Sequence, residues 1–167
     1  MRYTGDAMRL FCFSLLPLFA SVALAADPYN GPLPPKPDLP YLVHADNLVA
    51  TEATEAAQET KKDDTIYAIP GVSSPARTPV AEPIFLLQSD KLLPSKLELY
   101  RLDVKGGRRE VIMPGKGKKR SGPRPLHLTV TKLEGNLYRV EASEPLEDGQ
   151  YSLSPSDSNK VFCFEVY

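Results

Sequence analysis

Alternation of apolar and polar residues is the main pattern in the second half of the chain, and it predicts β-strands. Residues 97–105 and 108–113 alternate on either side of Gly106-Gly107, which fits a two-residue hairpin turn because glycine adopts positive φ at little cost. The turn predicts a register in which Lys105 faces Arg108, Leu102 faces Val111 and Tyr100 faces Met113. One apolar set then shares a single buried face: Tyr100, Leu102, Val104, Val111 and Met113.

Further strand patterns complete this half of the chain. Residues 84–87 form a short apolar run between Pro83 and Ser89, as in a strand covered on both faces. Residues 126–131 and 138–142 alternate around a Glu-Gly-Asn turn and predict a second hairpin. The last strand, 161–167, directs two sets of side chains to opposite faces: Phe162, Phe164 and Val166 to one, and Val161 and Cys163 to the other.

These segments predict an all-β fold, namely a small Greek-key β-sandwich of about seven strands over residues 84–167. An extended, proline-rich N-terminal region precedes it. The sandwich turns at Asp148-Gly149, because glycine accepts positive φ and aspartate bonds to its own backbone. The chain leaves this corner as a strand with Tyr151 and Leu153 on one face.

The corner resembles the one before strand F of immunoglobulin-like domains, through Leu146, Asp148, Gly149 and Tyr151. The resemblance implies a sandwich in which the Tyr151 hydroxyl bonds to upstream backbone, and it implies no function. The sequence departs from the antibody-type pattern, since Leu153 holds the position of the family's cysteine and the chain has no Trp. A tight link at Gly106-Gly107 also differs from the usual topology of that family.

The first 25 residues predict a signal peptide. Arg2 and Arg9 precede an apolar run over 10–24, and Ala23-Leu24-Ala25 supplies the small residues of a cleavage site. An uncleaved anchor is disfavoured because the run is short for a membrane span and contains Pro17. We therefore expect export to the periplasm or the medium, a mature protein that begins at Ala26, and no transmembrane segment after cleavage.

Residues 26–83 are expected to lie outside the sandwich. Six prolines over 26–41 predict a polyproline-like spacer. Residues 42–83 read as an irregular hairpin arm and linker, in which 51–62 has helical propensity but no apolar stripe. A surface helix and an extended arm both remain open; the arm, slightly favoured, pairs residues 48–49 with 66–69. Residues 70–83 predict another spacer because of their Gly and Pro residues.

Charge is concentrated in one predicted loop. Removal of residues 1–25 leaves 18 basic and 20 acidic residues, a net charge of −2, yet residues 106–125 alone carry +6. This predicts a site for anionic polymers or a solvated loop whose charge maintains solubility. The spacing is not that of a phosphate-binding P-loop, and no aromatic residue is interleaved to stack bases. The candidate anion-binding residues are Arg108, Arg109, Lys116, Lys118, Lys119, Arg120 and Arg124.

Catalytic and metal-binding patterns are weak. His44 and Asp46 are close in sequence, but a metal site would need distant His127 or Cys163 to converge with them. Cys12 leaves with the signal peptide, so Cys163 has no intramolecular disulfide partner. Its place among apolar residues of a strand predicts a buried, inert thiol, and an intermolecular disulfide is the alternative.

Two functional hypotheses remain, and the sequence predicts no cofactor. The first is an exported, non-catalytic β-domain that binds an anionic envelope polymer or another exported protein, with nucleic acid disfavoured. The second is a small secreted hydrolase or metal-dependent enzyme whose site is assembled only by the fold. The enzyme hypothesis requires a pocket in which His44, His127 or Cys163 meets a carboxylate.

Overall fold

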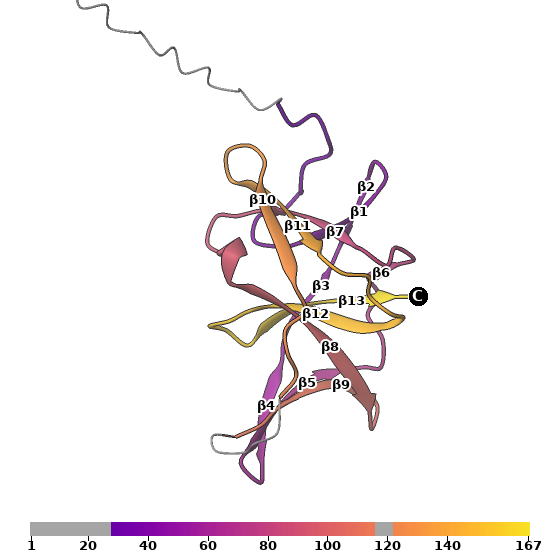
Figure 1. Ribbon diagram of the computed structural model, residues 1–167, viewed down its shortest axis with the longest axis vertical. Coiled ribbons are helices and arrows are strands. Elements are labelled where there is room, and N and C mark those ends of the chain that lie inside the picture. The colour runs from indigo at the N-terminus through magenta and orange to yellow at the C-terminus, as the bar shows by residue number, and fades with distance from the viewer. Residues whose placement is uncertain (1–27, 116–121) are drawn as a thin grey trace, which may run out of the picture.

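The computed structural model describes residues 28–115 and 122–167, and within them the fold is all-β (Figure 1). Two sheets, antiparallel apart from one short pairing, account for nearly all regular structure, as the sequence predicts. The described residues also include one 3₁₀ turn, η1 (Pro94–Lys96). The part of the chain that the structure describes contains no helix long and apolar enough to cross a bilayer. The strands are β1 (Tyr41–His44), β2 (Asn47–Ala50), β3 (Glu52–Glu55), β4 (Ala57–Lys61), β5 (Asp64–Pro70), β6 (Arg77–Thr78), β7 (Ile84–Gln88), β8 (Leu97–Lys105), β9 (Arg108–Met113), β10 (Leu128–Lys132), β11 (Leu137–Ala142), β12 (Gly149–Pro155) and β13 (Lys160–Val166).

The smaller sheet has the order β10-β11-β7-β1-β2 and forms the upper layer in Figure 1. The predicted hairpin is confirmed as β10–β11, with Val130 opposite Val140. β7 is central, and Phe85, Leu86 and Leu87 are all at most 3% exposed. The prediction that this apolar run is covered on both faces is therefore correct.

The larger sheet, β3-β13-β12-β8-β9-β5-β4, curls into a ring. Its two end strands are consecutive in the chain and are separated only by Ala56. β3 pairs with β13, whereas β4 pairs with β5, so one bent stretch of chain closes the ring. The Ala56 amide donates to the carbonyl of Asn159 at 2.8 Å, which fixes this bend against the β12–β13 turn.

The main core lies between the two sheets. Phe85 and Val140 of the smaller sheet pack against Tyr151, Phe162 and Phe164 of the larger one. Phe164 meets Phe85 edge-on at 5.0 Å between ring centroids and stacks with Tyr151 at 5.5 Å. Such aromatic pairs add to the stabilisation from area burial alone. This core is what makes the two sheets a sandwich.

A second core fills the ring, on the opposite face of β13. Val161 and Cys163 point into it, while Phe162 and Phe164 point into the main core, as the period-two alternation predicts. The other members of this second core are Ala56, Ile69, Leu102 and Val111, with Tyr67, Tyr100 and Met113 packed against them. Strands β8 and β13 therefore contribute to both cores.

The β8–β9 hairpin forms as predicted, with one exception. Lys105 lies opposite Arg108, and both turn glycines have positive φ, 58° and 79°. Leu102 and Val111 are buried inside the ring, but Val104 of the same face is 51% exposed. The prediction for Val104 is wrong, because this residue lies next to the Gly106-Gly107 turn, opposite Arg109, and belongs to neither apolar core.

Residues 42–83 are part of the folded domain, which corrects the prediction of an arm and linker. The seven strands within residues 84–167 match the predicted number, but β1 to β6 supplement them and join both sheets. Residues 51–62 are strand and not helix; β4 pairs with β5, while residues 48–49 pair with β1. The stretch 70–83 includes β6, which runs parallel to β13. Tertiary pairing overrides the local propensity in each case.

The end of the predicted spacer is also docked on the domain. Pro34 and Pro40 are buried, and the Asp38 carboxylate accepts backbone hydrogen bonds from Asp90, Lys91 and Leu92 at 2.8–2.9 Å. Although burial opposes ionisation, these bonds and the charge of Lys160 lower the pKa of Asp38. The end of the proline-rich segment is therefore fixed to the loop after β7.

The corner at β12 forms the predicted hydrogen bond. The Tyr151 hydroxyl donates to the Glu147 carbonyl at 2.7 Å, and the Tyr151 ring is 1% exposed. Gly149 has φ of 159°, and its missing side chain leaves room for the Arg101 guanidinium, which bonds to Glu147 and to the carbonyl of Asp148. The tyrosine therefore fixes the turn that leads into the centre of the larger sheet.

Candidate functional site

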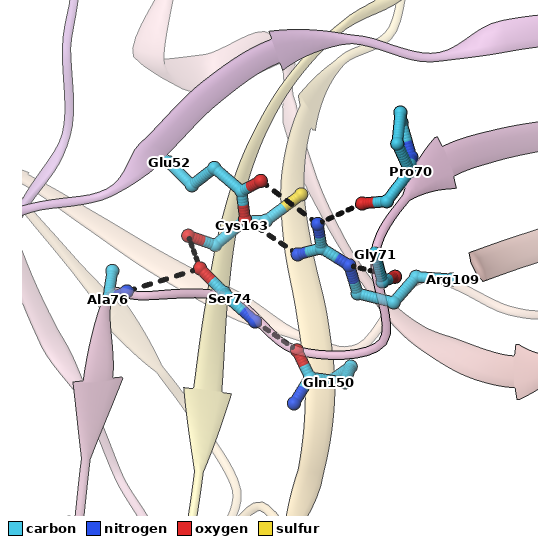
Figure 2. A network of polar contacts seen from close by, with 8 residues as sticks. All are labelled: Glu52, Pro70, Gly71, Ser74, Ala76, Arg109, Gln150 and Cys163. Atoms are coloured by element: carbon cyan, nitrogen blue, oxygen red, sulfur yellow. Dashed lines mark hydrogen bonds and ion pairs between the residues drawn. The ribbon is translucent and has the colours of Figure 1, made fainter. Parts of the chain in front are cut away.

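The neighbouring Arg108 and Arg109, both predicted to bind anions, lie on opposite faces of β9. Arg109 points into the ring and is 1% exposed. It donates two hydrogen bonds to the Glu52 carboxylate, at 2.6 and 2.9 Å, and two to the carbonyls of Pro70 and Gly71 (Figure 2). A guanidinium with these four internal acceptors is not available to an external anion. The prediction for Arg109 is therefore wrong, because a strand places adjacent side chains on opposite faces.

The Arg109–Glu52 ion pair closes one end of the ring. Burial acts to raise the pKa of Glu52, but hydrogen bonding to Arg109 and to the Ser74 hydroxyl, with the charge of Arg109, holds it below its ordinary value. Hydrogen bonding to Glu52 raises the pKa of Arg109. Both groups therefore stay charged in the folded protein, and each neutralises the other.

The segment between β5 and β6 crosses over this closed end. The Ser74 amide donates to the Gln150 side chain at 2.9 Å, and the Ser74 hydroxyl donates to the Cys163 carbonyl at 3.1 Å (Figure 2). Burial raises the pKa of the Cys163 thiol to about 12, and the residue is 0% exposed. The thiol is therefore buried and unreactive, as its position in the strand predicts.

Arg108 points outward and contributes to a basic groove on the outside of the ring. The groove has a volume of about 490 Å³ and a floor that includes Ile66 and Ile112. Arg108 itself is paired with Glu59 at 2.7 Å and with Glu110 at 2.9 Å. Around it are three lysines and one further carboxylate, namely Lys61, Lys62, Lys105 and Asp64.

Two of these lysines are available to a ligand. Among the described residues, neither Lys61 nor Lys105 forms an ion pair, and both are exposed. Lys61 follows Glu59 on the same face of β4, and Lys105 precedes the β8–β9 turn beside Arg108. The groove therefore combines an unpaired positive charge on each side with a partly apolar floor.

The remaining predicted anion-binding residues belong to the loop after β9. Lys116, Lys118, Lys119 and Arg120 lie outside the described residues. Arg124, on the far side of the loop, is exposed. Gly115, in the described part of the loop, is close to the groove, because its amide donates to the Asp64 side chain at 3.2 Å.

The other end of the ring opens into a cavity of about 160 Å³. Its deep part is apolar, with Ile69, Leu102, Val111 and Val161 on the wall. Its mouth is polar, and Tyr67 and Tyr100 lie between the two parts. The polar side chains at the mouth are half-buried or exposed and belong to Glu98, Ser154, Ser156, Ser158 and Asn159, whereas Ser152 is 1% exposed and adds a hydroxyl to the deep wall.

Glu98 and Tyr100 form a polar pair at this mouth. The Tyr100 hydroxyl donates to the Glu98 carboxylate at 2.8 Å. Burial, then this hydrogen bond and the negative charge of Glu98, raise the pKa of Tyr100 above its ordinary value. Tyr100 is therefore a neutral donor throughout the physiological range, and Glu98 keeps acceptor capacity for a second partner.

The enzyme hypothesis required a convergence that the described residues do not show. His44 ends β1, His127 is exposed before β10, and Cys163 is enclosed in the ring. Nowhere in residues 28–115 and 122–167 do three or more His, Cys, Asp or Glu side chains gather in a way that could hold a metal ion.

Sequence reasoning missed both the basic groove and the cavity. The lysines of the groove come from β4 and from the β8–β9 turn, which are more than 40 residues apart. The cavity combines side chains from β5, β8, β9 and β12 with the β12–β13 turn. The only available signal was the period-two placement of Tyr67, Tyr100 and Met113, since the curl of the sheet is a long-range property.

Comparisons with protein-family models, with curated proteins and with solved structures found no match. The immunoglobulin-like resemblance is therefore limited to the Tyr151 corner, and the geometry of this chain must support any functional argument.

Proposed function

We propose that the protein is an exported, non-catalytic binding module, and that its outer basic groove contacts an acidic glycan of the cell envelope. The observation that carries this proposal is the groove itself, in which Lys61 and Lys105 flank a floor that includes Ile112. Carboxylate or phosphate groups along a polymer would meet these ammonium groups, and release of counterions would favour the complex.

The charge distribution supports a surface contact of this kind. The mature chain has a net charge of −2, so as a whole it does not attract anions. A local excess of lysine and arginine would steer an anion electrostatically toward that part of the surface. The loop after β9 adds Lys116, Lys118, Lys119 and Arg120, next in sequence to a segment that reaches the groove. Both sets are therefore candidates for contact with the polymer, the second on the basis of its sequence alone.

Retention on immobilised polygalacturonate, a carboxylated polysaccharide, tests this contact. We expect Lys61→Ser/Lys105→Ser and a loop variant with Lys116, Lys118, Lys119 and Arg120 changed to Ser to elute at lower salt than the wild type, because each removes positive charge from one of the two sets. Lys36→Ser/Lys132→Ser is the matched control: it removes two exposed charges outside the groove and should elute close to the wild type.

Three outcomes would contradict the proposal. One is elution of both test variants with the wild type, and another is equal loss of retention in the matched control. The third is stronger competition by DNA or by anionic vesicles than by soluble polygalacturonate, which would reassign the contact to a different partner.

Export is the other half of the proposal and rests on the sequence of residues 1–25. We expect the exported protein to begin at Ala26. Intact-mass measurement of material recovered outside the cytoplasm checks this, and a mass that still includes residues 11–25 would exclude cleavage at this site.

A further inference from the structure

The cavity at the open end of the ring is separate from the basic groove. The groove lies on the outer face of β5 and β9, and the cavity lies on their inner face. In β9, for example, Ile112 faces the groove while Val111 and Met113 face the cavity. A ligand in the cavity therefore leaves the groove accessible, and an inference about one does not depend on the other.

The size of the cavity matches one small ring. A dry, engineered cavity of roughly 150 Å³ lined by aliphatic and aromatic side chains binds benzene. The cavity here has about 160 Å³, and its deep wall includes Ile69, Leu102 and Val111. Displacing water from such an apolar wall favours a ligand with an apolar body of about that size.

The mouth of the cavity is negative. Glu98 is the only acidic or basic side chain on the lining, apart from the tyrosines, within the described residues. The two lysines next to the lining in sequence interact elsewhere: Lys96 with Asp157 at 3.0 Å, and Lys160 with the Phe162 ring at 5.1 Å. An anionic ligand would meet an uncompensated carboxylate here, whereas a cation would neutralise it.

The rest of the mouth also suits a positively charged donor. The faces of tyrosine rings attract ammonium groups, and Tyr67 and Tyr100 both line the cavity between its apolar and polar parts. Serine hydroxyls and the Asn159 side chain can accept hydrogen bonds from N–H groups. An ammonium group placed beside Glu98 would have a charge partner, aromatic faces and neutral acceptors around it.

From these contacts we propose that the open end of the ring binds a small organic cation with an apolar body, of the arylalkylammonium class. The ring of the ligand enters the apolar part between β5, β8 and β9. Its ammonium group stays at the mouth, where it donates to the Glu98 carboxylate.

Benzylammonium is the probe, and benzyl alcohol and benzoate are its neutral and anionic counterparts of similar size. Titration calorimetry on the mature protein should show benzylammonium bound about tenfold more tightly than benzyl alcohol, because a hydrogen bond to a charged group contributes more than a neutral one. Benzoate should bind more weakly than both. In ¹H–¹⁵N spectra the shifts should concentrate on Tyr67, Tyr100, Met113 and Ser154.

Glu98→Gln isolates the charge, since glutamine can still accept the Tyr100 hydrogen bond. This variant should lose the preference for benzylammonium and keep its affinity for benzyl alcohol. Glu134→Gln removes the same charge from an exposed turn after β10 and should leave the preference intact. Ser154→Phe, at the half-buried mouth, should weaken both ligands if its thermal transition shows that it folds.

The proposal is overturned if benzylammonium does not bind at millimolar concentration, or if the three probes bind with equal affinity. It is also overturned if Glu134→Gln reduces the preference as much as Glu98→Gln does, or if the spectral shifts map to residues outside the ring.

Discussion

At the scale of single residues, the contrast between Arg108 and Arg109 shows how strand alternation separates an exposed arginine from a buried one. The two side chains are adjacent and chemically identical, yet the exposed side-chain fraction is 33% for Arg108 and 1% for Arg109. The alternation of a strand sends one to the basic groove and the other to the closed end of the ring. The face of the strand on which an arginine lies, and not its residue type, therefore decides whether its side chain is exposed to solvent or is buried in an internal ion pair.

Arg109→Met should be strongly destabilising. The substitution keeps an unbranched side chain but leaves the Glu52 carboxylate and the carbonyls of Pro70 and Gly71 without their donor. Breaking a buried ion pair by removing one partner costs about 3–5 kcal/mol of unfolding free energy. Urea denaturation of the variant and the wild type, with the m-value compared to verify two-state behaviour, measures this cost.

The neighbouring Arg108→Met is the matched control. Arg108 is 33% exposed and pairs with the exposed Glu59 and with Glu110, whose side chain is 7% exposed. Its loss should therefore cost more than the roughly 0–1 kcal/mol of a fully exposed pair but less than the loss of Arg109. Adding Glu52→Leu to Arg109→Met should recover part of the lost stability, since it removes the unpaired carboxylate. Equal costs for the two single variants would show that the Arg109 pair does not stabilise the closed end.

At the scale of elements, β13 connects the most parts of the structure. It pairs with β12 on one side and with β3 and β6 on the other. Its even-numbered side chains from Phe162 to Val166 enter the main core, and Val161 and Cys163 enter the second. One short strand at the end of the chain therefore contributes to both cores and closes the ring through β3.

Deletion of residues 161–167 should unfold the whole domain. Each of Phe162 and Phe164 is 0% exposed, and removing a buried aromatic side chain costs about 3–5 kcal/mol against a total stability of roughly 5–15 kcal/mol. The deletion also leaves β3 and β6 without a pairing strand. Circular dichroism during heating measures the result, and a cooperative transition retained by the truncated protein would contradict the role assigned to β13.

At the scale of the whole molecule, the ring and the smaller sheet form one structural unit. β8 and β13 carry the main core on one face and the second core on the other, so neither core can form without these strands. Polar closure by Arg109 and Glu52 at one end of the ring leaves the opposite end open as the cavity. The outer face of the same ring bears the basic groove, so one curled sheet presents two chemically distinct surfaces.

Much of the local structure was predictable from the sequence, for a clear physical reason. The β8–β9 turn at Gly106-Gly107, the β10–β11 hairpin and the two faces of β13 depend on period-two alternation and on turn chemistry, which act over a few residues. The Tyr151 hydrogen bond spans only four residues and was also predictable.

The strands in the first half of the chain could not be predicted in this way. β3 and β4 are polar, mostly exposed strands without a strong alternation, so their structure depends on distant partners.

The sequence by itself determined the all-β class, the hairpins of the second half and the local excess of positive charge, because each follows from residues close together in the chain. Only the tertiary structure decided that residues 41–78 complete both sheets, that Arg109 is buried while Arg108 is not, and that Glu98 and two tyrosines line one cavity. These outcomes depend on how a twisted sheet curls until its two ends meet at Ala56. That closure is set by pairings between strands up to about a hundred residues apart, which no local pattern encodes.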